Sequence, residues 1–227
     1  MTALDVLPIA ILGGVLGLDV VSFPQAMISR PLVASTLAGA LIGQTASGLM
    51  LGAALELIAL ETLPFGASRY PEWGSAAVVG GAIFASHPSH PAGAMSVGVV
   101  AALATTWVGG WTMVKLRQWN AAWAARKRDA LEAGARGAVV SLQLMGMTAD
   151  LARGVLLTAI AYTLLAPLAT WCLAHWSTDS RLSRAIVVAA AASVAGGAAW
   201  KLFHATAGAR WFFVSGLAVG FFFLFLR

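Results

Sequence analysis

The stretch Pro91-Ala-Gly-Ala-Met-Ser-Val-Gly-Val-Val-Ala-Ala-Leu-Ala-Thr-Thr-Trp-Val-Gly-Gly-Trp-Thr-Met-Val114 contains no charged side chain. A run of this length and composition can cross the hydrocarbon core of a bilayer, which takes about 20 helical residues. Three other apolar runs lie along the chain, at Val6 to Phe23, Val155 to Trp176 and Trp211 to Leu226. The sequence therefore predicts an all-α integral membrane protein that crosses the bilayer several times.

The composition of the whole chain agrees with a membrane location. Hydrophobic residues make up 59% of its 227 residues, and charged residues only 10%. A soluble domain of this size carries far more charge, so most of the apolar area must face lipid or other helices. We expect a single membrane domain over residues 1–227. The first apolar run lacks a basic segment before it and carries Asp5 and Asp19, so we expect it to be retained rather than cleaved as a signal peptide.

The most polar stretch, residues 115–136, separates two membrane halves at 1–114 and 137–227. It holds two acidic residues, Asp129 and Glu132, against six basic ones: Lys115, Arg117, Arg126, Lys127, Arg128 and Arg136. By the positive-inside rule this connector faces the cytoplasm, which predicts a multi-pass protein of the cell (inner or plasma) membrane. Trp119 and Trp123 share a helical face, which suits either an amphipathic helix at the interface or a solvated connecting helix. Such membrane flanks account for the net charge of +5, so nucleic acid is not an expected partner.

The first half is irregular between Arg30 and Phe84. Its apolar residues are interrupted at nine positions, too many for two regular spanning helices: Gly43, Gln44, Glu56, Glu61, Pro64, Gly66, Arg69, Pro71 and Glu72. Broken and re-entrant helices are tolerated at membrane depth only where protein or a water-filled cavity covers their free backbone groups. The pattern therefore predicts broken or re-entrant segments, which are typical of a transport site.

Small residues recur at a spacing of four and predict close helix packing. The pairs are Gly13/Gly17, Gly39/Gly43, Gly48/Gly52 and Gly216/Gly220. In addition, Ser29-Arg30 and Ser183-Arg184 each open a small-residue apolar run that ends near glycine. This similarity hints at an inverted repeat, although small-residue helices also resemble one another by composition alone.

Glu56 is the first candidate for a functional residue, because apolar residues surround it for a full helical turn on both sides. Burying a carboxylate there costs several kcal/mol unless it is paired, solvated by a cavity or protonated. A carboxylate at membrane depth is by default a functional-site candidate. The alternative is a structural glutamate that caps a broken helix or pairs with Arg30 or Arg69.

Carboxylates and amides around Glu56 suit a neutral polyol such as a sugar, because these groups bond several hydroxyls at once. The candidate substrate-binding residues are Glu56, Gln44, Glu72, Asp19, Gln25 and Arg30, with Glu61 nearby. Each of them, Glu56 apart, could equally be an interfacial or loop residue.

No catalytic residue, metal site or cofactor is predicted. The pair His87 and His90 lies in His-Pro-Ser-His-Pro, where the prolines favour an extended loop and no third ligand is near. His175 and His204 are more typical of interfacial residues, and the single cysteine, Cys172, excludes an internal disulfide. The sequence lacks a phosphate-binding glycine-rich loop, a His-Glu-x-x-His motif and a nucleophile elbow.

Three stretches resemble the IIC membrane subunit of the mannose/fructose/sorbose phosphotransferase systems. They read Ile28-Ser-Arg-Pro-Leu-Val-Ala-Ser-Thr-Leu-Ala-Gly-Ala-Leu-Ile-Gly43, Gly48-Leu-Met-Leu-Gly-Ala-Ala-Leu-Glu-Leu-Ile-Ala-Leu60 and Gly66-Ala-Ser-Arg-Tyr-Pro-Glu72. The three stretches lie within residues 28–84, and their spacing matches the family without gaps from Ser29 to about Phe84, about a quarter of the chain.

This resemblance implies a sugar-translocating permease component with a re-entrant, elevator-like transport domain and a trimeric assembly. It implies a second membrane subunit of the IID type as partner, besides membrane lipid, and soluble IIA and IIB phosphocarriers. In this family the phosphoryl group comes from IIB, so the chain would bind and move sugar without a phosphoryl-transfer residue of its own. That agrees with the missing phosphoryl-transfer motifs.

The chain also departs from the family pattern. Gly43-Gln44 stands where the family usually has Gly-Asp, and Pro71-Glu72 where it has Pro-Asp. Beyond Trp107 only Arg153, in Asp150-Leu-Ala-Arg153, resembles a family residue. A degenerate, non-transporting regulatory or scaffold partner of a phosphotransferase chain is therefore the alternative function.

Overall fold

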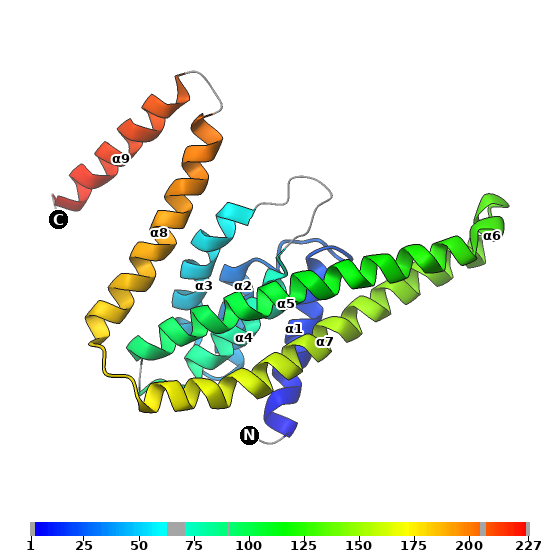
Figure 1. The fold of residues 1–227 in the computed structure, drawn as a ribbon, viewed down its shortest axis with the longest axis horizontal. Helices are drawn as coiled ribbons and strands as arrows, with labels where there is room; N and C mark the ends of the chain where they lie inside the picture. The colour runs from blue at the N-terminus through cyan, green and yellow to red at the C-terminus, as the bar shows by residue number, and fades with distance from the viewer. Residues whose placement is uncertain (1–2, 63–70, 90, 205–207, 226–227) are drawn as a thin grey trace.

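A computed structural model describes residues 3–62, 71–89, 91–204 and 208–225 (Figure 1). In these residues every regular element is a helix and none is a strand, which confirms the predicted all-α fold. The α-helices are α1 (Ala3–Asp19), α2 (Pro31–Leu41), α3 (Thr45–Ala59), α4 (Trp73–Ala85), α5 (Pro91–Arg126), α6 (Arg128–Glu132), α7 (Arg136–Ala174), α8 (Ser180–His204) and α9 (Ala209–Phe225), and a short 3₁₀ segment, η1 (Leu60–Thr62), follows α3.

Three helices of the described chain are long and apolar enough to cross a membrane. They are α5, α7 and α8, while α2, α3, α4 and α9 are shorter apolar helices. The 36 residues of α5 extend over about 54 Å. The hydrocarbon core is only about 30 Å thick, so a perpendicular α5 would reach well beyond it.

The segment predicted to be broken forms three short helices. Of these, α2 and α3 form a hairpin that turns at Gly43, whose φ of +78° is readily adopted by glycine. The turn is closed by the Gln44 N–H, which donates to the Gly39 carbonyl at 2.8 Å. The prediction of broken helices is thus confirmed for the described part. Three of the interrupting residues, Pro64, Gly66 and Arg69, lie outside the described residues, as does His90.

Helix α4 occupies the centre of the molecule. Every residue from Gly74 to Ala85 is buried, and α4 contacts α1, α2, α3, α5 and α7. Small side chains allow this crowding, since a Cβ at Gly80 would lie 2.6 Å from the Gly98 carbonyl oxygen. Leu51 from α3 and Met95 from α5 are buried in the same apolar core. The core thus forms around a helix too short to span the bilayer alone.

The predicted small-residue contacts lie within the chain. A Cβ at Gly48 would lie 2.4 Å from the Ser35 carbonyl oxygen, and one at Gly39 would lie 2.8 Å from the Gly48 Cα. The close pair is therefore α2 and α3 of the same hairpin. In contrast, a Cβ at Gly216 or Gly220 would meet no described atom within 4 Å. The glycines of the hairpin thus give no reason of their own to expect a second subunit, and oligomerisation stays a prediction.

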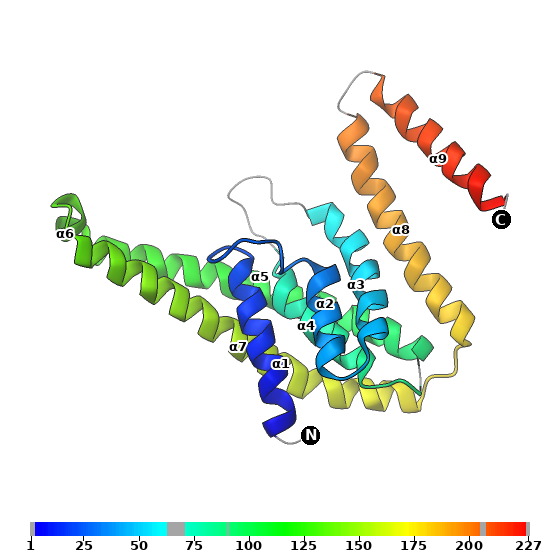
Figure 2. The same cartoon turned by 180° about the vertical axis from the view of Figure 1, so that it is seen from behind.

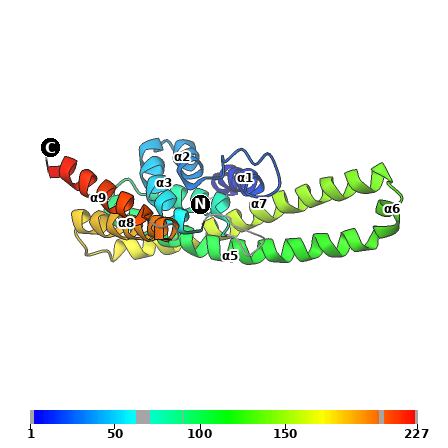
Figure 3. The same ribbon diagram turned by 90° about the horizontal axis from the view of Figure 1, so that it is seen from above.

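Residues 115–136 do not form a separate connector helix. Lys115 to Arg126 continue α5 without a break, α6 follows, and the chain turns at Gly134, with φ +69°, into α7. The reason is local, since no proline or glycine interrupts the helical stretch after Val114. We call the projecting hairpin of residues 115–148 the arm, which extends away from the other helices in Figures 2 and 3. Its Trp119 and Trp123 rings lie 5.8 Å apart on one face, as predicted.

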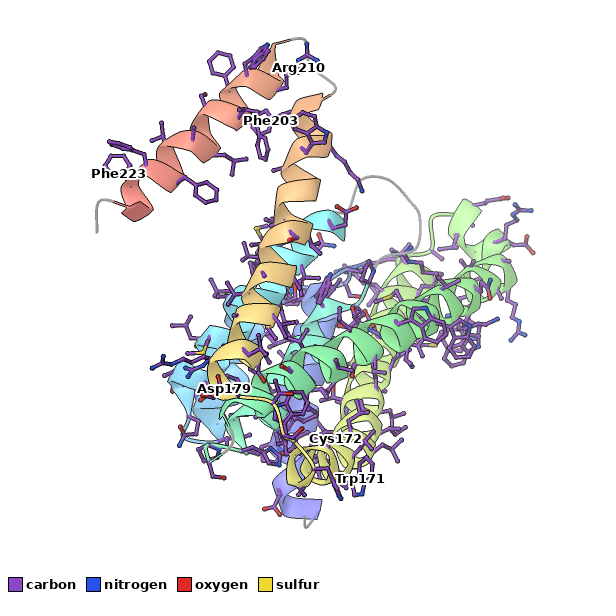
Figure 4. The ribbon with its side chains drawn as sticks, turned by 60° about the vertical axis from the view of Figure 1, so that its left-hand side comes forward. Trp171, Cys172, Asp179, Phe203, Arg210 and Phe223 are labelled. Atoms are coloured by element: carbon purple, nitrogen blue, oxygen red, sulfur yellow. The ribbon has the colours of Figure 1, made fainter. Side chains whose placement is uncertain are left out.

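The last two helices form a second hairpin, in which α9 packs on α8 (Figure 4). The Phe203 and Phe213 rings meet between them at 5.8 Å. Helix α8 continues through Gly196 and Gly197, whereas the segment after Arg30 breaks into a hairpin at Gly43. The two stretches that open with Ser-Arg therefore differ in local structure, and the inverted repeat stays a prediction.

Candidate functional site

Five of the six predicted binding residues lie at one end of the helix bundle, which we call the polar end. Asp19 ends α1 and accepts from the Ser29 N–H at 2.9 Å, so the end of α1 lies beside the start of α2. Glu72 precedes α4, and a Cβ at Gly17 would lie 3.2 Å from its Oε1. The sixth residue, Gln44, is exposed in the turn at the other end of α2.

Glu56 has a cationic partner at the polar end. The Arg30 Nε donates to Glu56 Oε1 at 2.6 Å, and the Leu32 N–H in the first turn of α2 donates to Oε2 at 3.1 Å. The side chains of Arg30 and Glu56 are 26% and 23% exposed, so the pair is reachable from outside the core. These contacts match the structural alternative, in which Glu56 pairs with Arg30 and caps a broken helix. Contact between Glu56 and a sugar stays a prediction.

Asp19 organises the segment between α1 and α2. Its Oδ1 accepts from the Ala26 N–H at 2.7 Å and its Oδ2 from the Ser29 N–H, and Asp19 is only 2% exposed. The segment needs such anchoring because Gln25 and Met27 both have positive φ, at 59° and 62°. The exposed Gln25 amide donates to the Val21 carbonyl. Asp19 and Gln25 therefore both stabilise the conformation of this loop.

Glu72 is the most deeply buried of the predicted residues, at 1% exposure. It caps α4 by accepting from the Ser75 N–H on Oε1 at 3.0 Å, while Oε2 has no hydrogen-bond partner among the described residues. Its carbonyl accepts from the Thr106 hydroxyl at 2.9 Å. A Cβ at Gly109 would lie only 2.7 Å from the Glu72 Cβ, so glycine is needed at this contact.

A buried ion pair on α7 lies next to Glu72. The Arg153 Nε donates to Asp150 Oδ1 at 2.9 Å, and the Ser22 hydroxyl donates to Asp150 Oδ2. Arg153 Nη1 donates to the Thr112 hydroxyl of α5 at 3.3 Å. The side chains of Arg153 and Asp150 are 9% and 1% exposed. The pair therefore joins α7 to α5 and to the segment after α1.

Arg153 and Glu72 are neighbours without a direct hydrogen bond. The position of a Cβ on Gly17 is 3.2 Å from Glu72 Oε1 and 3.8 Å from Arg153 Nη2, and this Nη2 has no hydrogen-bond partner among the described residues. We call Glu72, Asp150 and Arg153 the buried charge cluster. Glu72 Oε2 accepts no described hydrogen bond. Arg153 Nη2 lies 2.9 Å from Asp150 Oδ1 as an ion-pair contact and makes no other described contact to an acceptor. A hydroxyl-bearing ligand needs such acceptors and donors. Unused polar groups in a core require an explanation.

Sequence reasoning did not include Asp150, Thr112 or Ser22 in the candidate site. One sequence feature could have indicated the ion pair. Asp150 and Arg153 are three residues apart in a largely apolar stretch, so both lie on one face of the helix. Their proximity to Glu72 depends on helix packing, and no local pattern reveals it.

The histidine motif is engaged in protein contacts. His87 Nδ1 lies 2.8 Å from the Ile83 carbonyl oxygen, and Nε2 lies 3.0 Å from the Thr170 hydroxyl. Within the described ranges, no three His, Cys, Asp or Glu side chains gather in a group that could hold a metal ion. His87 therefore contributes to the packing of α4 against α7.

Long apolar helices, a broken hairpin and buried charges define a polytopic α-helical membrane protein. The chain belongs to the family of sorbose-specific IIC components of the phosphotransferase system, whose profile matches residues 3–226. The predicted family is thereby confirmed, and the match extends through the second half, where the resemblance was faint. The protein is a membrane component of a sugar phosphotransferase system.

Two solved structures share the fold. One, described only as a membrane protein, is 17% identical with a TM-score of 0.74. The other is the mannose transporter ManYZ, determined by electron cryomicroscopy in complex with the microcin MceA, at 18% identity and a TM-score of 0.63. Each alignment covers 97% of this chain and 88% of the other. No curated protein sequence matches this chain.

Proposed function

We propose that this chain binds and translocates sugar as the IIC permease component of a mannose-family phosphotransferase system and passes the sugar to a separate IIB phosphocarrier. The observation that carries the proposal is the family match over residues 3–226. The likeness of the fold to a mannose transporter adds support. The chain itself transfers no phosphoryl group in this scheme.

The polar end is the proposed sugar site. Two carboxylates there, Glu56 and Glu72, are held next to the guanidinium groups of Arg30 and Arg153. Carboxylates accept from sugar hydroxyls and guanidinium groups donate to them, so such a site can hold several hydroxyls together. Asp19 and Gln25 would support the loop over this end, whereas Gln44 lies too far along the α2–α3 hairpin to join the same ligand contacts.

The proposed partners are a IID-like membrane subunit and soluble IIA and IIB phosphocarriers, in an oligomer of the trimeric kind. The proposed location is the cell inner or plasma membrane. Exposed apolar side chains along α7, including Leu156, Ile160, Leu164 and Leu168, leave ample surface for lipid or for such a membrane partner.

Changing Glu56 to glutamine tests the sugar site. Glutamine keeps one acceptor oxygen, which can serve Arg30 or the Leu32 N–H but not both. The pair is partly exposed, so water can satisfy the other donor, and the abundance of the protein in the membrane should fall only slightly. A charge-assisted hydrogen bond to sugar, worth about 1.5–3 kcal/mol, would become a neutral one worth about 1 kcal/mol. Equilibrium binding of labelled hexoses to the chain purified with its membrane partner should weaken about ten-fold.

The matched control is Glu132→Gln on the arm, where the carboxylate is 72% exposed and forms an ion pair with Arg128. This control should leave sugar affinity unchanged. Unaltered affinity in the Glu56→Gln variant would remove Glu56 from the site. If the variant fails to accumulate in the membrane, the ion pair of Glu56 with Arg30 is instead required for folding.

The arm is expected to face the cytoplasm, because its basic excess lies beside membrane segments. Ala125 is exposed near the end of α5 and accepts a cysteine there, in a background where Cys172 is replaced by alanine. An impermeant thiol reagent should leave Ala125→Cys unlabelled in intact cells and label it after permeabilisation. Labelling in intact cells would show that the arm faces the outside of the cell, contrary to the prediction.

A further inference from the structure

A groove of about 1080 Å³ lies between α5 and α7, along the stretch where the arm leaves the other helices. Because the two helices are antiparallel, the groove has two chemically different ends. Ala104, Ile160 and Leu164 line one end, and Lys115, Trp119 and Thr148 line the other. The lining thus changes along its length from mainly apolar, with Thr105 beside Ala104, to basic and aromatic.

The basic end of the groove carries the positive charge of Lys115. Lys115 is exposed, its ammonium group lies 5.8 Å from the Trp111 ring centre, and none of the ion pairs in the described chain includes it. No acidic side chain lines the groove within the described residues. Arg153 also lines the groove, but its side chain is nine-tenths buried and its charge is offset by Asp150, whose Oδ1 lies 2.9 Å from Nη2. Lys115 is therefore the cation that a ligand in the groove would meet.

We propose that this groove is a binding site for one anionic phospholipid. Its acyl chains lie along the apolar end, between Val108 and Ile160, and its phosphate group pairs with Lys115. Trp119, which is 59% exposed, takes the position at headgroup level that tryptophan favours. The groove shares Arg153 with the proposed sugar site, but Lys115, Trp119 and its apolar lining lie outside that site, so lipid binding there would not require the chain to transport sugar.

The gradient of the lining favours a lipid over a helix from another subunit. A partner helix would need an apolar face along the whole groove and would have to bury Lys115 against it, at a cost in desolvation. A lipid molecule changes from apolar tail to charged headgroup over the same length. Basic residues near such headgroups contribute about 1 kcal/mol each, which corresponds to about a five-fold change in affinity.

The test uses the full chain, purified in detergent, stripped of lipid and titrated with phosphatidylglycerol or phosphatidylcholine of identical acyl chains. Native mass spectrometry then counts the bound lipid. We expect phosphatidylglycerol to bind at least five-fold more tightly than phosphatidylcholine. Lys115→Gln should remove about five-fold of the phosphatidylglycerol affinity and leave phosphatidylcholine unchanged. Equal binding of the two lipids would overturn the proposal.

Two further variants separate the groove from general surface charge. Lys127→Gln removes the same charge from the arm outside the groove, where Lys127 donates to the Ser141 hydroxyl, and should leave lipid affinity unchanged. Ala152→Trp, at an exposed position in the lining, should weaken binding of both lipids by filling the groove. If Lys115→Gln and Lys127→Gln lose the same phosphatidylglycerol affinity, the lipid is attracted by the overall surface charge and not by the groove, which would overturn the proposal. Loss of all bound lipid when the membrane partner is co-purified would show a subunit interface instead.

Discussion

Replacing Arg153 with methionine is expected to lower the free energy of unfolding by about 3–5 kcal/mol, the range for breaking a buried ion pair. Methionine has a similar length but leaves Asp150 and Glu72, each 1% exposed, without the cation beside them. The link from α7 to Thr112 of α5 is lost as well. Reversible unfolding of the detergent-solubilised chain by a denaturing detergent measures the change.

The matched control is the same substitution in an exposed ion pair. Arg128 is 76% exposed and lies 3.6 Å from Glu132 one helical turn away, so Arg128→Met should cost no more than about 0.5 kcal/mol. Similar losses at Arg153 and Arg128 would contradict the view that the buried charge cluster holds α7 in place.

A methyl group added at Gly48 is expected to destabilise the protein by about 1–3 kcal/mol, the usual cost of overpacking. The new Cβ would lie 2.4 Å from the Ser35 carbonyl oxygen and 3.0 Å from the Gly39 Cα, so α2 and α3 would have to separate. Backbone atoms cannot move aside as a flexible side chain can. Unfolding of Gly48→Ala in the same detergent assay gives the loss.

Gly197→Ala provides the comparison, because a Cβ at this helical position would meet no described atom within 4 Å. Alanine is a better helix former than glycine by about 0.5–1 kcal/mol, so this variant should be as stable as the original chain or more so. Equal behaviour of the two variants would mean that the α2–α3 hairpin tolerates more space than its contacts indicate.

The fold could be predicted largely from the sequence because few backbone structures can satisfy their hydrogen bonds inside a bilayer. Apolar runs such as Pro91 to Val114 specify helices, and the polar interruptions after Arg30 specify that these helices break. The lengths were harder to predict. The length of α5 depends on Lys115 to Arg126 remaining helical, and charged residues that mark a membrane boundary do not mark the end of a helix.

The site was only partly predictable for a related reason. The pairing of Glu56 with Arg30 could be named as an alternative, because a charge in an apolar run needs a partner. The approach of Arg153 to Glu72 joins residues 81 positions apart, through the packing of α4 and α7 around glycines, and no periodicity encodes it. Gln44 was grouped with Glu56 by sequence proximity, but a hairpin sends its turn to the opposite end.

The buried charge cluster and the Arg30–Glu56 pair place opposite charges at the ends of α1, α2, α3 and α4, where these short helices meet. Helix ends carry free backbone groups that need polar partners when buried. In the proposed sugar site, a polyol would contact the same side chains that satisfy these helix ends, so stability and sugar binding would depend on one set of residues. Variants at Glu72 should therefore be tested for folding before any loss is assigned to transport.

The permease function is tested by uptake and phosphorylation of labelled hexose in cells that lack their own mannose-type transporter. The chain is expressed with a IID-like subunit and the IIA and IIB phosphocarriers, and each is omitted in turn. We expect labelled sugar phosphate to accumulate inside the cells only when this chain is present together with all its partners. Accumulation at the same rate without the chain, or none with every partner present and folded, would contradict the permease function and favour a regulatory or scaffold role.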